Sequence, residues 1–239
     1  MREERAGGLR IRLTGGTDGR GGGSGPAVIL LHGFGAPGND LVPIGDALAV
    51  PPGTRFIFPE GPLSLSFGYG DSRAWWLIDM ARLEADRAAG RVRDLSTEVP
   101  RGLPQARAAL EQLLVELPRV LPVDYKKTVI GGFSQGAMLT CDLAMRTAHP
   151  FAGLVQLSGT LLARQEWRPS VAKRSGFPVF QSHGTQDPIL PYGMAERLRD
   201  ALTQAGLAVA WHSFRGGHEI PEPVMRQLSA FLTNLLNRP

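Results

Sequence analysis

The chain has 239 residues, a hydrophobic content of 43% and a formal net charge of +4. This length suits one α/β domain with a full core, and no run of eighteen apolar residues predicts a transmembrane helix. The basic residues are mostly arginines scattered among acidic residues, without a basic stripe interleaved with aromatics, which indicates a solvated surface and argues against a nucleic-acid partner.

The first half of the chain predicts three strands, one helix and a long excursion. Alternating apolar and charged residues at 9–13 indicate an edge strand. Residues 15–25 are rich in glycine and are expected to form a flexible connection. The expected elements are strands at 9–13, 27–31 and 55–58, a helix over about 40–49, and an excursion over about 59–100.

In the second half of the chain, strands alternate with helices. The expected order is a helix at 104–117, a strand from residue 129 followed by a helix, strands at 153–157 and 178–183, a helix at 191–205, a strand at 208–214 and a final helix at 221–236. This alternation predicts a mostly parallel central sheet with helices on both faces, in a single domain over 1–239. Sites in such sheets lie at the carboxyl ends of the strands.

A serine stands between two glycines in Gly132-Phe133-Ser134-Gln135-Gly136, after an apolar run and before a helical pattern. This strand–turn–helix setting is the one that a nucleophile elbow requires, because the strained serine leaves room only for glycine at its flanks. Ser134 is therefore the predicted nucleophile, and it needs a base to accept its proton.

Two later strands each lead into a loop with a residue that would complete a catalytic triad. Asp187 follows the strand at 178–183, and His218 follows the strand at 208–214. The chain order Ser, Asp, His is that of α/β-hydrolases. His218 is the predicted base, and Asp187 is predicted to hold its tautomer and stabilise the imidazolium.

Main-chain N–H groups are predicted to form the oxyanion hole. One comes from Gln135, directly after the nucleophile, and the other from Phe34 in the loop after the strand at 27–31. His32 and His183 each precede a glycine at a strand end and are expected to support the site structurally. No histidine spacing fits a zinc site, so neither a metal nor a cofactor is expected.

Together these motifs resemble the phospholipase/carboxylesterase family of α/β-hydrolases, which includes the acyl-protein thioesterases. The segments that carry the resemblance are His32-Gly33-Phe34-Gly35, Pro59-Glu60-Gly61-Pro62, Arg73-Ala74-Trp75-Trp76, Gly132-Phe133-Ser134-Gln135-Gly136, Leu157-Ser158-Gly159, His183-Gly184-Thr185-Gln186-Asp187-Pro188-Ile189-Leu190-Pro191 and Gly217-His218-Glu219. The resemblance implies the α/β-hydrolase fold and a serine carboxylesterase that works through an acyl-enzyme intermediate. Acyl-protein thioesterase or lysophospholipase activity is the alternative.

The excursion is expected to set substrate choice. Trp75 and Trp76 are the expected substrate contacts, one lining the acyl pocket, although two core tryptophans are an equally good interpretation. With Phe67 and Tyr69, they would give an aromatic edge that favours short- to medium-chain esters, up to about eight to ten carbons.

Two other interpretations remain, a different enzyme and, from a different class, a protein without catalysis. A dienelactone-hydrolase-like enzyme would need cysteine in place of Ser134, and a non-catalytic binding protein of this fold would typically have a broken triad. The expected partner is a small-molecule ester, without stable membrane insertion, and a homodimer is compatible with the sequence. The single cysteine, Cys141, and a polar N-terminus favour the cytoplasm.

Overall fold

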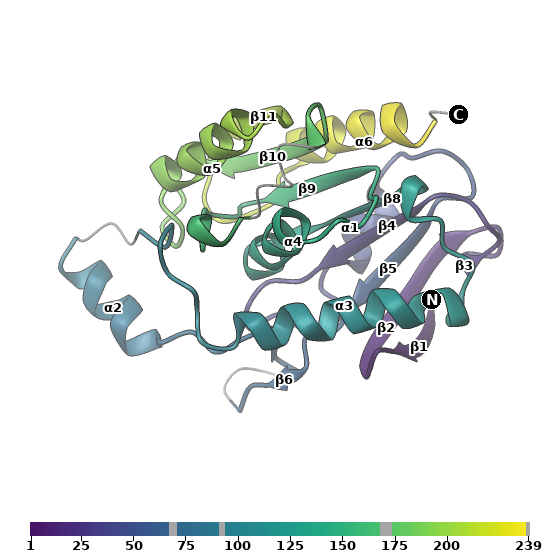
Figure 1. Ribbon diagram of the computed structural model, residues 1–239, viewed down its shortest axis with the longest axis horizontal. Helices are drawn as coiled ribbons and strands as arrows, with labels where there is room; N and C mark the ends of the chain where they lie inside the picture. Colours follow the sequence, from purple (N-terminus) through teal and green to yellow (C-terminus); the bar gives the residue numbers. More distant parts are fainter. Residues whose placement is uncertain (67–70, 91–93, 168–173, 238–239) are drawn as a thin grey trace.

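The computed structural model describes residues 1–66, 71–90, 94–167 and 174–237, and its centre is a nine-stranded sheet (Figure 1). The strands lie in the order β1-β2-β5-β4-β8-β9-β10-β11, with β3 paired to β2. Their bounds are β1 Arg2–Ala6, β2 Leu9–Gly16, β3 Arg20–Gly22, β4 Ala27–Leu31, β5 Arg55–Pro59, β8 Thr128–Phe133, β9 Gly153–Leu157, β10 Pro178–Gly184 and β11 Ala208–Phe214. All neighbours from β5 to β11 are parallel, which confirms the predicted α/β-hydrolase class with its mostly parallel sheet.

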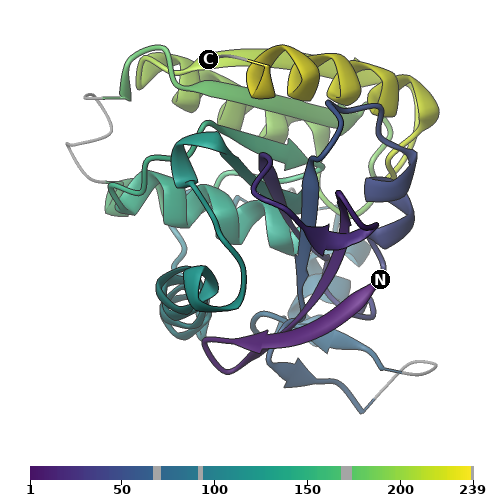
Figure 2. The ribbon, with the colours of Figure 1, turned by 90° about the vertical axis from the view of Figure 1, so that its right-hand side faces the viewer.

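Helices cover both faces of this sheet (Figures 1 and 2). Residues of β4 alternate between two hydrophobic clusters, because successive strand side chains point to opposite faces. Ile29 and Leu31 belong to the cluster that also contains residues of α3, α4 and α5, whereas Val28 and Leu30 belong to the cluster that contains residues of α6 and the residues that flank α1. The helices are α1 Val42–Ala47, α2 Met80–Ala88, α3 Leu103–Val120, α4 Gln135–Arg146, α5 Tyr192–Gln204 and α6 Glu222–Leu236. Two short 3₁₀ turns lie at Tyr125–Lys127 and Arg164–Glu166.

The N-terminal segment is more ordered than the sequence indicated. The strand expected at 9–13 extends to Gly16, and it is not an edge strand, because β1 pairs with it in antiparallel register. The glycine-rich connection includes β3, because the Asp18 carboxylate accepts the N–H groups of Arg20 and Gly22 at 2.8 Å each. The expected flexible connection over 15–25 was therefore wrong.

The excursion has little secondary structure of its own. It contains the two-stranded pair β6 Leu63–Ser64 and β7 Arg73–Ala74, followed by α2, which stands apart from the sheet in Figure 1. The remaining predicted helices are present with shifted ends, most of all α1, which is four residues shorter than the expected 40–49, and α3, which is longer than 104–117. In the described part of the chain, no helix is both long and apolar enough to span a bilayer.

Candidate active site

Ser134 lies in a strained turn between β8 and α4. Its φ is 53° and its ψ is −116°, a conformation that costs a non-glycine residue about 1–3 kcal/mol. The turn is held on both sides, because the Ser134 N–H donates to the Leu157 carbonyl at 2.9 Å and its own carbonyl accepts the Met138 N–H at 3.1 Å. The flanking glycines have no room for a side chain: a methyl group on Gly136 would lie 2.5 Å from the Leu31 carbonyl carbon.

Asp187 and His218 meet at the ends of the neighbouring strands β10 and β11. Nδ1 of His218 lies 2.6 Å from Oδ2 of Asp187, and this short distance is that of a charge-assisted hydrogen bond. The carboxylate can only accept, so Nδ1 carries the proton and Nε2 is left as an acceptor. The His218 ring lies 4.7 Å, between centroids, from the ring of Phe133, the residue before Ser134. The predicted base thus lies beside the predicted nucleophile elbow.

The Asp187 carboxylate is fully buried and receives four donors. Burial raises its pKa, but hydrogen bonds from His183 and His218 and from the Leu190 N–H outweigh burial, so the net pKa is well below the usual range. Oδ1 accepts the N–H groups of Ile189 and Leu190 at 2.8 and 2.9 Å, and Nε2 of His183 lies 3.2 Å from Oδ2. The acid therefore stays ionised beside the imidazole, as a triad requires.

The loop after β4 lies directly against the elbow. A methyl group built on Gly33 would lie 3.3 Å from the Cβ of Ser134. Phe34, the next residue, is half-buried, and Gln135, at the start of α4, is fully buried. The two residues predicted to supply the oxyanion hole thus lie on the two segments that flank the serine.

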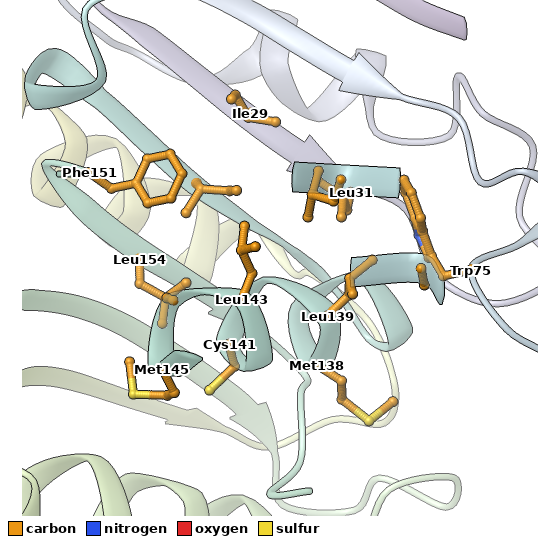
Figure 3. Packing of buried hydrophobic residues seen from close by; sticks show 14 of the residues in the cluster. Ile29, Leu31, Trp75, Met138, Leu139, Cys141, Leu143, Met145, Phe151 and Leu154 are labelled. Atoms are coloured by element: carbon orange, nitrogen blue, oxygen red, sulfur yellow. The ribbon is translucent and has the colours of Figure 1, made fainter. Parts of the chain in front are cut away.

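Trp75 and Trp76 do not line an open pocket in this structure. Trp75 is 2% exposed and Trp76 is 3% exposed, and both belong to the core cluster that includes Leu31 and Leu139. Figure 3 shows Trp75 together with Leu31 and Leu139. The interpretation of two core tryptophans therefore describes the side chains as they lie here. Phe67 and Tyr69 fall outside the described residues.

Sequence reasoning missed a buried charge cluster beside the site. The carboxylate of Glu60 lies 2.9 Å from a guanidinium nitrogen of Arg12 and 3.2 Å from one of Arg73. The main chain of Arg73 bonds to the loop after β4 through Gly35 and Ala36. Glu60 and Arg73 both stand in segments that carried the family resemblance, so the signal was present. Within the described ranges, no group of three or more His, Cys, Asp or Glu side chains could hold a metal ion.

Comparison with known proteins places this geometry in context. The profile of the phospholipase/carboxylesterase family matches residues 22–236. Acyl-protein thioesterase 1 of Candida albicans is 25% identical over 223 residues, covering 89% of this chain and 93% of that protein.

Solved structures of an acyl-protein thioesterase and of an esterase have a similar fold. The crystal structure of Zea mays acyl-protein thioesterase 2 matches with a TM-score of 0.71 and 25% identity, covering 95% of this chain and 99% of that one. That of esterase PE8 matches with a TM-score of 0.74 and 25% identity, covering 94% and 99% of the two chains.

Proposed function

The chain belongs to the phospholipase/carboxylesterase family and is a serine hydrolase, and from this premise we propose that it is a carboxylesterase that uses Ser134 as its nucleophile. The observation that carries the proposal is the 2.6 Å contact between Nδ1 of His218 and Oδ2 of Asp187, at strand ends beside the strained Ser134. Such a pair leaves Nε2 free to accept a serine proton.

In the acylation step, Ser134 Oγ attacks the ester carbonyl carbon while Nε2 of His218 accepts the hydroxyl proton. The resulting oxyanion is bound by the main-chain N–H groups of Phe34 and Gln135. When the tetrahedral intermediate collapses, the bond to the alcohol oxygen breaks, and His218 returns the proton to that oxygen. Asp187 stays ionised and stabilises the imidazolium throughout.

In the deacylation step, water takes the place of the alcohol. His218 removes a proton from the water as the hydroxyl attacks the acyl carbon, and the second collapse releases the acid and returns the proton to Ser134. Both steps use the same base and the same oxyanion hole, and they need no oxidant, reductant or cofactor.

Acyl-protein thioesterase activity is the second candidate, because relatives and solved structures similar to this chain are named as acyl-protein thioesterases. A thiolate leaves more readily than an alkoxide, so the same residues would also cleave a thioester. The preference for short or medium acyl chains follows from an aromatic edge of Phe67, Tyr69, Trp75 and Trp76. Because Trp75 and Trp76 are buried, it remains a prediction that a chain-length series tests.

The test combines labelling with kinetics. A fluorophosphonate probe should modify wild-type protein at Ser134, located by peptide mass spectrometry, and leave Ser134→Ala unmodified. Ser134→Ala should lower kcat for p-nitrophenyl butyrate by about 10⁶ without changing the unfolding temperature, because the triad acts as a unit. Residual turnover near the wild-type value in purified Ser134→Ala would refute the assignment.

A second set of rates separates the two candidates. Oxygen esters and thioesters with matched acyl chains of two to sixteen carbons, in steps of two, are compared by kcat/KM. A carboxylesterase should show a maximum at or before about eight to ten carbons, since each buried methylene contributes about 0.8 kcal/mol until the pocket is full. A rate that climbs to sixteen carbons and is highest for thioesters would favour the thioesterase.

A further inference from the structure

The two N–H groups assigned to the oxyanion hole belong to different parts of the fold. Phe34 lies in the loop after β4, and Gln135 opens α4. An oxyanion hole works only if its donors are fixed before the charge develops, so something must hold these two segments in register. Residues 73–76, which we call the bracing segment, contact both.

The first contact is made by the side chain of Gln135. It is fully buried, and its Oε1 accepts the Trp75 N–H at 2.9 Å while its Nε2 donates to the Trp76 carbonyl at 2.8 Å. The amide therefore pairs with the bracing segment through both of its polar atoms. Any movement of residues 75 and 76 is transmitted to the residue whose own N–H faces the oxyanion.

The second contact runs from Trp75 to the loop after β4. The indole N–H of Trp75 donates to the His32 carbonyl at 3.1 Å, and the two rings lie 5.5 Å apart. Nε2 of His32 accepts the Gly61 N–H at 2.9 Å, so the proton is on Nδ1, which donates to the Gly33 carbonyl at 2.8 Å.

This last bond reaches the reacting centre. The Gly33 carbonyl and the Phe34 N–H belong to one peptide group, so a donor on the oxygen fixes the direction of the N–H and polarises it. Burial lowers the pKa of His32, which keeps the imidazole neutral and its hydrogen-bond pattern fixed.

The third contact is between main chains. The Gly35 N–H donates to the Arg73 carbonyl at 2.8 Å, and the Arg73 N–H donates to the Ala36 carbonyl at 3.1 Å. The guanidinium of Arg73 is in turn paired with the buried carboxylate of Glu60 at 3.2 Å. This end of the bracing segment is thereby anchored to the carboxyl end of β5.

We propose that Trp75 and the side chain of Gln135 are positioning residues that hold the Phe34 and Gln135 N–H groups in register, and that the bracing segment serves the transition state rather than the acyl chain. The inference rests on the proposed function, because it assigns these two N–H groups to the oxyanion. It gives the buried Trp75 a kinetic role without any contact with substrate.

The test uses two variants that keep a buried side chain of similar shape but remove hydrogen bonds, although phenylalanine is smaller than tryptophan. Trp75→Phe keeps an aromatic ring and loses the indole N–H, and Gln135→Met keeps the chain length and loses both amide contacts. Gln181→Met is the matched control, because Gln181 is 1% exposed and its Nε2 donates to the Ala195 carbonyl at 2.8 Å, between β10 and α5. Each preparation is titrated with fluorophosphonate so that kcat refers to competent enzyme.

With p-nitrophenyl acetate, each bracing variant should lower kcat by about 10- to 100-fold with KM within about threefold, because misplaced donors are felt only when charge develops. The affinity for phenylboronic acid, a tetrahedral mimic, should fall in parallel, and the acid limb of the pH profile should not move. The double variant should lose less than the product of the two single losses, since both act through one brace. Gln181→Met should keep kcat.

Two results would overturn the proposal. If both variants keep kcat and boronate affinity per titrated site while only their unfolding temperatures fall, the segment is structural. If the losses appear in KM and grow with acyl length, Trp75 shapes the acyl pocket instead. Failure of the proposed function has a different signature, because wild-type protein would then neither react with the fluorophosphonate nor hydrolyse the ester.

Discussion

Gly136 is the second residue of α4, and the structure leaves no room for a side chain on its Cα. A methyl group there would lie 2.5 Å from the Leu31 carbonyl carbon and 2.7 Å from the His32 carbonyl oxygen, both of them main-chain atoms. Rigid backbone cannot move aside as a side-chain end can. Gly136→Ala must therefore push the start of α4 away from the end of β4, which carries the loop of the proposed oxyanion hole.

The cost follows from these contacts. Overpacking a tight core costs about 1–3 kcal/mol, and backbone atoms on the receiving side place this case at the upper end, about 3 kcal/mol. For a domain of this size, that loss lowers Tm by about 6–12 °C. The displaced main chain of Gln135 should also lower kcat by about 10- to 100-fold, since a shift of about 1 Å has effects of this order.

Gly193 supplies a matched control, because it is also the second residue of a helix, α5, and no atom of the described residues lies within 4 Å of a methyl group built on it. Gly193→Ala should raise stability by about 0.4–1 kcal/mol, since alanine restricts the unfolded chain more than glycine does. Differential scanning fluorimetry and ester hydrolysis of both variants, side by side, give the comparison. If Gly136→Ala unfolds and turns over like Gly193→Ala, the close packing of β4 against the elbow is not what fixes the site.

Three further predictions concern other buried groups. Asp187→Asn should lower kcat by about 10⁴, because the amide no longer enforces the His218 tautomer. The pKa of the Asp187 carboxylate is lowered in the folded protein, so its stabilisation should be complete above about pH 4 and should shrink as the pH falls further. The unfolding free energies of wild-type and Asp187→Asn protein should therefore approach each other as the pH falls below about 4. Cys141 should not react with an aromatic disulfide while the protein is folded, because burial and then the Asp142 carboxylate raise its thiol pKa; rapid labelling at pH 8 would contradict this. Asp142→Ala should cost about 3–5 kcal/mol in urea unfolding, because it leaves two largely buried arginines, Arg107 and Arg146, without their shared carboxylate; a loss below 1 kcal/mol would contradict it.

Some strands could be predicted from local sequence and others could not. Apolar residues predicted β4 and β9 with their observed bounds, because strands buried on both faces are nearly continuous apolar runs, and in β9 only Gln156 is polar. The segment Arg2–Ala6 has four charged residues, and nothing local marks it as a strand. It forms β1 because β2 offers its free edge, and because Glu3 pairs with Arg12 across the two strands at 3.0 Å.

The same distinction holds at the candidate site. Ser134, Asp187 and His218 could be proposed because each has a local signal, a turn motif or a position after a strand, and parallel strands bring their carboxyl ends to one edge. The hydrogen bond between Gln135 and Trp75 joins residues sixty positions apart, so it depends on the packed fold. An amide side chain has no sequence pattern that says whether it faces solvent, substrate or another main chain.

The proposed nucleophile and a buried ion-pair cluster lie at opposite ends of α4. Directly before its first residue, Ser134 has a strained conformation that costs about 1–3 kcal/mol and persists only because the surroundings fix it. Every residue from Gln135 to Met145 is buried, so the helix cannot relax that strain by shifting. At the other end, Asp142 ties the helix to α3 through Arg107 at 2.6 Å. Loosening that far tie lowers the free energy of unfolding but leaves the elbow in place while the protein is folded. At temperatures well below its lowered Tm, we therefore expect Asp142→Ala to keep the wild-type kcat. Gly136→Ala, in contrast, should have a reduced kcat even at temperatures at which it is fully folded.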